Sequence, residues 1–246
     1  MKAIMLAAGV GRRLYGDDYE QPPKCLLEFG NKTLMQRHLE NLQALSIDAM
    51  TLVLGHRADT ILDSAQVHAA DGFINPVFNP YYRGGPVVSL WMARDVLRSG
   101  DDIIFMDADV LYQPEMLERL VHSNHDNCFL FDREIEDGDE PVRLCLADGT
   151  PVDFGKNIEG DFDQVGEWPG FLKLSPAVAA KIADALDGYI DSARMHVAYE
   201  PAMRDVLKTE PKGTFGIEDV SDMAWIEIDF VEDLDRARDE ILPQIS

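Results

Sequence analysis

The sequence predicts an α/β protein built on a doubly wound, mostly parallel, Rossmann-like sheet. The first observation is an apolar run over residues 3–8, which is typical of a strand buried on both faces of a parallel sheet. The second is that further apolar runs alternate with segments whose apolar residues recur at helical spacing. The third is that several of these runs end in glycines or carboxylates, and the ends of parallel strands are where such sheets bind ligands.

The first half of the chain shows this alternation most clearly. Thr33 can cap a helix whose apolar face is formed by leucines 34, 39, 42 and 45. The next strand, over residues 49–54, is closed by Gly55-His56-Arg57, and Pro76 interrupts the strand after it. The elements expected after Thr33 are a helix to about residue 45, a strand at 49–54, a helix at 58–69, a strand at 73–78, a helix at 87–97, a strand at 102–106, a helix at 113–122 and a strand at 127–131.

The second half is expected to contain more strands. They are predicted at 142–146, 151–155, 170–174, 215–217 and 224–228, with helices at 176–186, 199–207 and 231–241. The acidic stretch at 132–140 lacks hydrophobic periodicity, so it is read as a solvated loop where a small, β-rich, substrate-facing lobe of residues 132–215 begins. No linker or repeat divides the chain, which predicts a single domain over residues 1–246.

The net charge of the chain disfavours some classes of binding partner. With 22 basic and 45 acidic residues its formal net charge is −23, which argues against nucleic acid or an anionic membrane as a partner. The apolar run after Lys2 is short and is followed at once by two arginines, so it does not read as a signal peptide. Three cysteines without metal-ligand spacing suit a reducing compartment, and a cytoplasmic location is expected. The oligomeric state stays open, with a homodimer as one alternative.

The loop after the first strand carries the most specific signal. Glycines past a strand let the backbone approach a ligand, and arginines and a lysine held after two prolines provide cations for phosphate oxygens. The pattern Leu-Ala-Ala-Gly-x-Gly-x-Arg-Leu over residues 6–14, followed by Pro23-Lys24, resembles the signature of the nucleotidyltransferases that join a nucleoside triphosphate to a phosphorylated small molecule. The resemblance implies a GT-A-like fold and enzymatic activity.

The same resemblance implies roles for individual residues. Lys24 would steady the α-phosphate and the incoming phosphate, Arg13 the departing pyrophosphate, and Lys156 the acceptor phosphate. The residues expected to bind the nucleotide are Leu6, Ala7, Ala8, Gly9, Gly11, Arg12, Gly84, Gly85, Ser89 and Asp107. Two departures from the family pattern are Arg12, where relatives often carry a small residue, and the acidic loop 15–21, which is either a lid or a solvent-facing segment.

Two acidic pairs at strand ends predict a metal site. Asp107 and Asp109 follow the strand at 102–106, and Glu227 and Asp229 end a late strand. By resemblance, Asp109 and Asp229 hold the metal, with Asp107 and Glu227 as helpers. Hard carboxylate oxygens that share a site with phosphates suit Mg²⁺. The simpler alternative for the first pair is an aspartate that caps the next helix.

The acceptor end is assigned to aromatic and acidic neighbours. Aromatic residues beside carboxylates can cage an ammonium group, although most such neighbours are ordinary half-buried packing. The residues assigned on this basis are Trp168, Glu167, Tyr199 and Glu200. The order of motifs is most similar to that of compact cytidylyltransferases for phosphocholine and aminoalkylphosphonates.

The expected reaction is therefore transfer of CMP from CTP to a small phosphate or phosphonate monoester, with release of pyrophosphate. The near alternative is a sugar-1-phosphate or inositol-phosphate acceptor. A metal-dependent glycosyltransferase and a non-catalytic nucleotide sensor are the other readings, and the 9–24 signature with both Lys24 and Asp109 present speaks against each.

Overall fold

A computed structural model describes residues 1–136 and 140–245, and it is organised around a seven-stranded sheet. The strand order is β13-β8-β12-β6-β1-β4-β5. The bounds of these strands are Gly216–Asp219, Cys128–Phe131, Phe171–Leu174, Ile103–Asp107, Lys2–Ala7, Ala49–Leu54 and Ile74–Phe78, in that order. The strand β1 lies between β4 and β6 and is parallel to both, so the loop that follows it emerges near the middle of the sheet edge. Only β12 runs antiparallel to its neighbours, β6 and β8, within this sheet.

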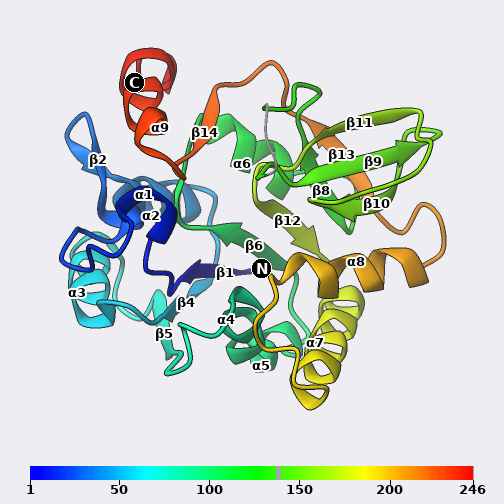
Figure 1. Cartoon of the computed structure of the whole chain (residues 1–246), viewed down its shortest axis with the longest axis horizontal. Helices are drawn as coiled ribbons and strands as arrows, with labels where there is room; N and C mark the ends of the chain where they lie inside the picture. Colours follow the sequence, from blue (N-terminus) through cyan, green and yellow to red (C-terminus); the bar gives the residue numbers. More distant parts are fainter. Residues whose placement is uncertain (137–139, 246) are drawn as a thin grey trace.

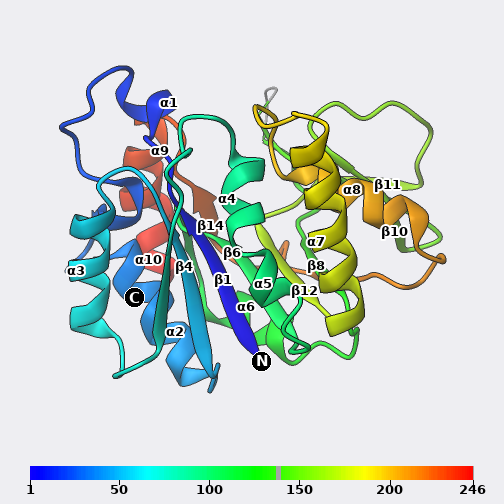
Figure 2. The same cartoon turned by 90° about the horizontal axis from the view of Figure 1, so that it is seen from below.

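Helices cover both faces of the central sheet, as expected for a doubly wound fold. The side chains of β1 alternate between two cores, with Ile4 in one and Ala3 and Met5 in the other. The first core is covered by α4 (Pro86–Met92), α5 (Arg94–Leu97), α7 (Pro176–Asp191) and α8 (Glu200–Thr209), of which α4, α5 and α7 lie side by side in Figure 2. The second is covered by α2 (Leu34–Ala44), α3 (Ala58–His68) and α6 (Pro114–Val121).

A second, three-stranded sheet leaves the central one after β8 and returns at β12. It has the order β10-β9-β11, with bounds Thr150–Gly155, Arg143–Ala147 and Gln164–Glu167, and it lies on the opposite side of the molecule from α2 and α3 (Figure 1). Its base is closed by Asp132 and Glu167, which exchange backbone hydrogen bonds of 2.9 and 2.7 Å. The stretch predicted as a lobe, 132–215, also holds β12 and α7, which belong to the central sheet and its cover; residues 137–139 of the acidic stretch lie outside the described part.

The last part of the chain packs beside the loop that follows β1. The strand β14 (Trp225–Glu227) pairs with β7 (Val110–Tyr112), so the two acidic pairs of the sequence are brought to adjacent chain segments. Ile226 and Ile228 share a small third core with Leu14 of α1 (Arg12–Tyr15) and with Ala237. The chain then continues through α9 (Val231–Arg236), the π-helical turn η2 (Ala237–Ile241) and α10 (Leu242–Ile245).

The predicted fold class is confirmed, and several local expectations needed adjustment. The helix expected at 87–97 is divided at Ala93 into α4 and α5. The helix expected at 231–241 is α-helical over α9 and continues as the π-helical turn η2. The apolar stretch at 25–29 forms the 3₁₀ turn η1 (Lys24–Leu26) and then β2 (Glu28–Phe29), which pairs with β3 (Lys32–Thr33). The strands β7 and β11 were not predicted. Within residues 1–136 and 140–245, no helix is both long and apolar enough to cross a membrane.

Candidate active site

A cavity of about 510 Å³ opens at the ends of β1 and β6, where the predicted residues converge. Every residue that the sequence assigned to the nucleotide lines it: Leu6, Ala7, Ala8, Gly9, Gly11, Arg12, Gly84, Gly85, Ser89 and Asp107. Arg13, Lys24, Asp109 and Lys156 line the same cavity. The cavity therefore gathers the first loop, one acidic pair and the lysine beyond β10 in one place.

The first loop contains Gly9 and Gly11, and the absence of a side chain has a different effect at each. Gly11 has a φ of +67°, a left-handed conformation that glycine adopts without strain, and it starts the short helix α1. A Cβ added at Gly9 would meet no described atom within 4 Å, so the backbone there borders open space in which a ligand can approach. The acidic part of the loop is tethered, because the Arg57 guanidinium donates to the backbone oxygens of Glu20 and Gln21.

Lys24 lines the cavity and pairs with two carboxylates. Its Nζ is 2.6 Å from Asp229 and 3.1 Å from Asp109, and its side chain is 12% exposed. Burial alone would lower the pKa of Lys24, but the two carboxylates outweigh it and raise the pKa above its ordinary value. Lys24 is therefore held as a positioned cation by Asp109 and Asp229.

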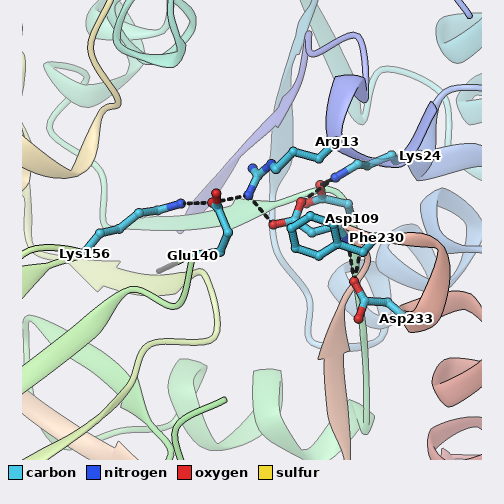
Figure 3. Close-up of polar contacts among 8 residues, drawn as sticks. Arg13, Lys24, Asp109, Glu140, Lys156, Phe230 and Asp233 are labelled. Atoms are coloured by element: carbon cyan, nitrogen blue, oxygen red, sulfur yellow. Dashed lines mark hydrogen bonds and ion pairs between the residues drawn. The ribbon is translucent and has the colours of Figure 1, made fainter. Parts of the chain in front are cut away.

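Arg13 and Lys156 approach from opposite sides of the cavity and share one carboxylate. The guanidinium of Arg13 donates to Asp229 and, at 2.5 Å, to Glu140; the Nζ of Lys156 lies 2.6 Å from the same Glu140 oxygen. Figure 3 shows this chain of contacts, with Glu140 between Lys156 and Arg13. Together with the contacts of Lys24, it forms an alternating-charge chain in the order Lys156, Glu140, Arg13, Asp229, Lys24, Asp109.

The carboxylates of Asp109, Glu227 and Asp229 could hold a metal ion. One oxygen of each lies within 4.8 Å of the others, and three hard oxygen donors of this kind fit a divalent ion such as Mg²⁺. Although Glu227 as a whole is exposed, local desolvation of its carboxyl and the nearby carboxylates of Asp109 and Asp229 raise its pKa above the usual range. The buried Asp233 carboxylate fixes the backbone at Asp229, since it accepts hydrogen bonds from the backbone N–H groups of Asp229 and Phe230. Figure 3 shows Asp233 beside Phe230 with these contacts as dashed lines.

Asp107 is separated from this group and has a different partner. Its carboxylate accepts a 2.5 Å hydrogen bond from the Tyr199 hydroxyl. Burial, with Asp109 nearby, raises the pKa of Asp107 well above its usual range. Gly170, with a φ of +87°, leaves room for that carboxylate, since an added Cβ would lie 3.0 Å from Asp107 Oδ2.

The residues predicted for the acceptor divide into three kinds. Trp168 and Tyr199 border the cavity but are buried in an aromatic cluster with Phe105, and the Trp168 indole donates to a backbone oxygen at 2.7 Å. Glu167 is not among the residues that line the cavity, because its carboxylate turns back to accept from the N–H of Glu136. Glu200 lines the cavity, is 8% exposed, and has no described hydrogen-bond partner for its Oε2.

The Gly84-Gly85 turn serves the protein's own packing as well as the cavity. A Cβ at Gly85 would lie 2.6 Å from the backbone oxygen of Met195 and 2.8 Å from the carbonyl carbon of His196. Since those atoms are backbone, they could not move aside easily. The His196 ring also contacts the Gly84 oxygen at 3.2 Å. The turn before α4 is thus clasped to the segment that leads into α8.

Sequence patterns did not identify several residues that border or support the cavity. Glu140 was read as part of a solvated acidic run, and Asp233 as one of many acids in the last helix. Tyr82 and Arg83 also line the cavity, and the Arg83 guanidinium lies over the rings of Tyr19 and Tyr82 at 5.3 and 5.8 Å. Only Asp233 had a local signal, as the third residue of a helix whose capping it completes.

Comparisons with known proteins find a matching family profile and several similar proteins. The family profile described as the MobA-like NTP transferase domain matches residues 3–154. The chain is 26% identical over 239 residues to the CMP-5'-(3-aminopropyl)phosphonate synthase of Streptomyces rubellomurinus, covering 93% of this chain but 37% of that protein. It is 23% identical over 256 residues to the CTP:phosphoglutamine cytidylyltransferase of Campylobacter jejuni, covering 96% of this chain and 98% of that protein.

The fold has a close counterpart among solved structures. The inositol-1-phosphate CTP transferase from T. maritima superposes with a TM-score of 0.76 at 17% identity, over 99% of this chain and 95% of that one. At this level of identity the likeness concerns the fold: a GT-A-like central sheet with its ligand cavity at the strand ends.

Proposed function

The chain belongs to the MobA-like NTP transferase domain family of nucleotidyltransferases, and on this premise we propose that it transfers CMP from CTP to a small phosphate or phosphonate monoester, releasing pyrophosphate. The observation that carries the proposal is the alternating-charge chain in the cavity. It sets Lys24 and Arg13 beside the metal-binding carboxylates on one side and Lys156 on the other. Both named relatives form or use cytidylyl compounds.

The proposed step needs no nucleophile from the protein. An oxygen of the acceptor's phosphate or phosphonate forms a bond to the α-phosphorus of CTP. The bond from that phosphorus to the oxygen bridging to the β-phosphate breaks, and its electron pair leaves with pyrophosphate. Lys24 would offset charge that develops on the α-phosphate, Arg13 would hold the leaving pyrophosphate, and Lys156 would orient the acceptor anion.

A divalent metal, proposed as Mg²⁺, would be held by Asp109 and Asp229 with Glu227 beside them. When bound, such an ion neutralises phosphate charge and orients phosphate oxygens. In the structure, Lys24 pairs with both Asp109 and Asp229, and Arg13 pairs with Asp229. Asp233 would act as a positioning residue, because it fixes the backbone from which Asp229 projects.

We propose further that the acceptor carries an amine, and Glu200 is the residue that supports this. A carboxylate that is 8% exposed and has an oxygen without a described partner gains from a cation that enters the cavity. Trp168 and Tyr199 would shape the wall beside it rather than form an open cage, since their rings already pack against each other and against Phe105. The buried, unpaired cysteines suit a reducing compartment such as the cytoplasm.

The reaction is tested by measuring pyrophosphate release with Mg²⁺ for each of the four ribonucleoside triphosphates. Phosphocholine, 2-aminoethylphosphonate, inositol phosphate and glucose 1-phosphate are supplied in turn as acceptors. We expect release with CTP and an amine-bearing acceptor. If CTP gave release only with inositol phosphate or glucose 1-phosphate, the acceptor would be a polyol or sugar phosphate and not an amine. No release with any combination would contradict the proposal.

The acceptor's amine is tested by comparing 2-aminoethylphosphonate with ethylphosphonate, which has no charge at that end. We expect kcat/KM to fall about tenfold or more without the amine, and Glu200→Gln to remove most of that preference. Glu118→Gln, an exposed change on α6 that removes the same charge away from the cavity, should leave the preference intact. Equal kcat/KM for both acceptors would rule out amine recognition.

A further inference from the structure

We propose that the Glu140 carboxylate occupies a substrate-phosphate position between Arg13 and Lys156. There it competes for these two cations with free pyrophosphate, which can reach both of them when no acceptor is bound, and so it sets the affinity for pyrophosphate. The inference rests on the phosphate-binding roles given to Arg13 and Lys156 and goes beyond them, because Glu140 has no part in the proposed reaction. It acts through Arg13 and Lys156 and is therefore a positioning residue.

The geometry shows one anion shared by two cations. A single oxygen, Oε2 of Glu140, lies 2.5 Å from Arg13 Nη1 and 2.6 Å from Lys156 Nζ. Arg13 lies in α1, and Lys156 follows β10. The two cations are therefore far apart in the sequence, and both line the cavity. An oxygen that bridges two such cations marks a position that a phosphate oxygen can also fill.

Glu140 differs from the other carboxylates in the alternating-charge chain. Asp109 and Asp229 also pair with cations, but they lie within 4.8 Å of Glu227 and can exchange those cations for a metal when phosphates arrive. Glu140 is not part of that three-carboxylate group. When a phosphate takes Arg13 and Lys156, the Glu140 carboxylate therefore has to give up both contacts.

The exposure of Glu140 makes such displacement feasible. Its side chain is 43% exposed, so the carboxylate can return to water instead of being stranded in the protein. Lys156 and Arg13 hold the pKa of Glu140 below its usual range, so it is ionised and a true competitor at neutral pH. A built-in competitor weakens the binding of the leaving group and so favours its release.

The experiment titrates inorganic pyrophosphate, and separately inorganic phosphate, into the full chain by calorimetry in the absence of nucleotide. We expect Glu140→Gln to bind pyrophosphate about three- to tenfold tighter than the wild type, the range for two partly exposed ion pairs. The matched control is Glu136→Gln, which removes the same charge four residues earlier, where Glu136 pairs with Arg236 at 2.6 Å. It should bind pyrophosphate like the wild type.

A second pair of variants tests the competition directly. If Glu140 acts by occupying Arg13 and Lys156, the gain from Glu140→Gln should shrink at least twofold in a Lys156→Met background. Glu140→Ser provides a second way to vacate the position should the glutamine form contacts of its own. Unchanged or weaker pyrophosphate binding in both Glu140 variants would overturn the inference.

These titrations do not depend on the reaction. If no nucleotide is turned over but Glu140→Gln binds pyrophosphate tighter, the proposed function fails and the competing role of Glu140 stands. If CTP is turned over and the Glu140 variants show no gain, the inference alone fails.

Discussion

At the scale of single residues, Lys24 shows how the cavity holds a largely buried cation between two carboxylates. A lysine that is 12% exposed is costly to bury, and it persists because Asp109 and Asp229 both lie within 3.1 Å of its Nζ. Removing the ammonium would leave two nearby carboxylates facing each other without compensation. The same ammonium is proposed to act on charge that develops at the α-phosphate, so its structural and catalytic contributions need separate measurements.

The first prediction separates them with Lys24→Met. We expect kcat to fall by about a hundredfold or more while KM for the nucleotide changes less than about threefold, because the interaction strengthens in the transition state. Thermal stability without Mg²⁺ should also fall, and added Mg²⁺ should restore more of it than in the wild type, since the unpaired carboxylates gain most from the ion. A raised KM with unchanged kcat would instead assign Lys24 to ground-state binding.

A second prediction concerns Glu167, whose pKa is raised to about 7 by burial, with Glu136 and Asp132 adding to the shift. In the unfolded chain this carboxyl has the ordinary glutamate pKa of about 4.5, so between these two pH values the folded protein binds the extra proton. The contribution of Glu167 to the free energy of unfolding is therefore fully present below pH 4.5, and it is lost as the pH rises through the pKa of about 7 in the folded protein. Glutamine mimics the protonated form at every pH.

Urea unfolding of Glu167→Gln checks this. The variant should be more stable than the wild type at pH 8, by up to about 3 kcal/mol, and nearly equal to it at pH 4.5. The control Glu159→Gln, at an exposed position, should follow the wild type at both pH values. A Glu167→Gln protein that is no more stable at pH 8 would show that Glu167 stays ionised without penalty.

Which residues could be predicted follows from how local their signals are. Lys24, Arg13 and Asp109 belong to short motifs at strand ends, and the structure places them in one cavity. Glu140 carries no such signal, because its role depends on two cations that are distant in sequence. Glu167 was expected to face the acceptor on the strength of its aromatic neighbour, but a strand alternates its faces, and Trp168 takes the cavity side.

At the scale of elements, the clasp between the turn before α4 and the segment before α8 couples two halves of the cavity. Gly85 is extended, with a φ of −169°, so its requirement for glycine is one of space and not of backbone conformation. The turn lines the part of the cavity expected to hold the nucleotide, and the segment it touches leads to Tyr199 and Glu200.

Gly85→Ala tests this contact. The added methyl would lie 2.6 Å from the Met195 oxygen, so we expect a loss of about 1–3 kcal/mol in unfolding free energy and a raised KM for both substrates. Gly188→Ala is the matched control, because Gly188 lies in α7 and an added Cβ there meets no described atom within 4 Å. That change should stabilise the protein by about 0.5–1 kcal/mol. If both variants behaved alike, the turn and the segment would not be packed as described.

The strands that sequence patterns missed are the ones that depend on partners. The strand β11 contains Gly166, whose lack of a side chain admits the ring of Phe131 and the backbone of Asp132, and this leaves no alternating pattern to detect. The strand β7 is three residues long and exists because β14 pairs with it from more than a hundred residues away. By contrast, the observed bounds of β4 match the prediction, since the strand is apolar except for Thr51 and is ended by Gly55.

At the scale of the whole molecule, the cavity is locally balanced inside a strongly acidic protein. The formal net charge of −23 opposes the approach of any nucleotide at long range, while the contacts of Lys24 and Arg13 act only at short range. Salt screens the former more than the latter, because Lys24 is enclosed.

We therefore expect kcat/KM for the nucleotide to rise, by up to about threefold, when ionic strength increases from 0.05 to 0.3 M at fixed free Mg²⁺. Steady-state pyrophosphate assays across this range, with potassium chloride and potassium acetate compared to exclude a specific anion effect, measure it. A steep fall in kcat/KM with both salts would mean that exposed cations dominate the encounter.

The closed base of the small sheet has a consequence for changing what the protein accepts. The chain leaves the central sheet at Asp132 and returns towards it at Glu167. The backbone N–H of each of these two residues donates to the backbone oxygen of the other. A cassette cut at this pair could be exchanged for that of a relative without shifting the register of β8 or β12. Such chimaeras would carry Lys156 and Glu140 together, as one transferable unit, while Arg13 and Lys24 stay with the recipient.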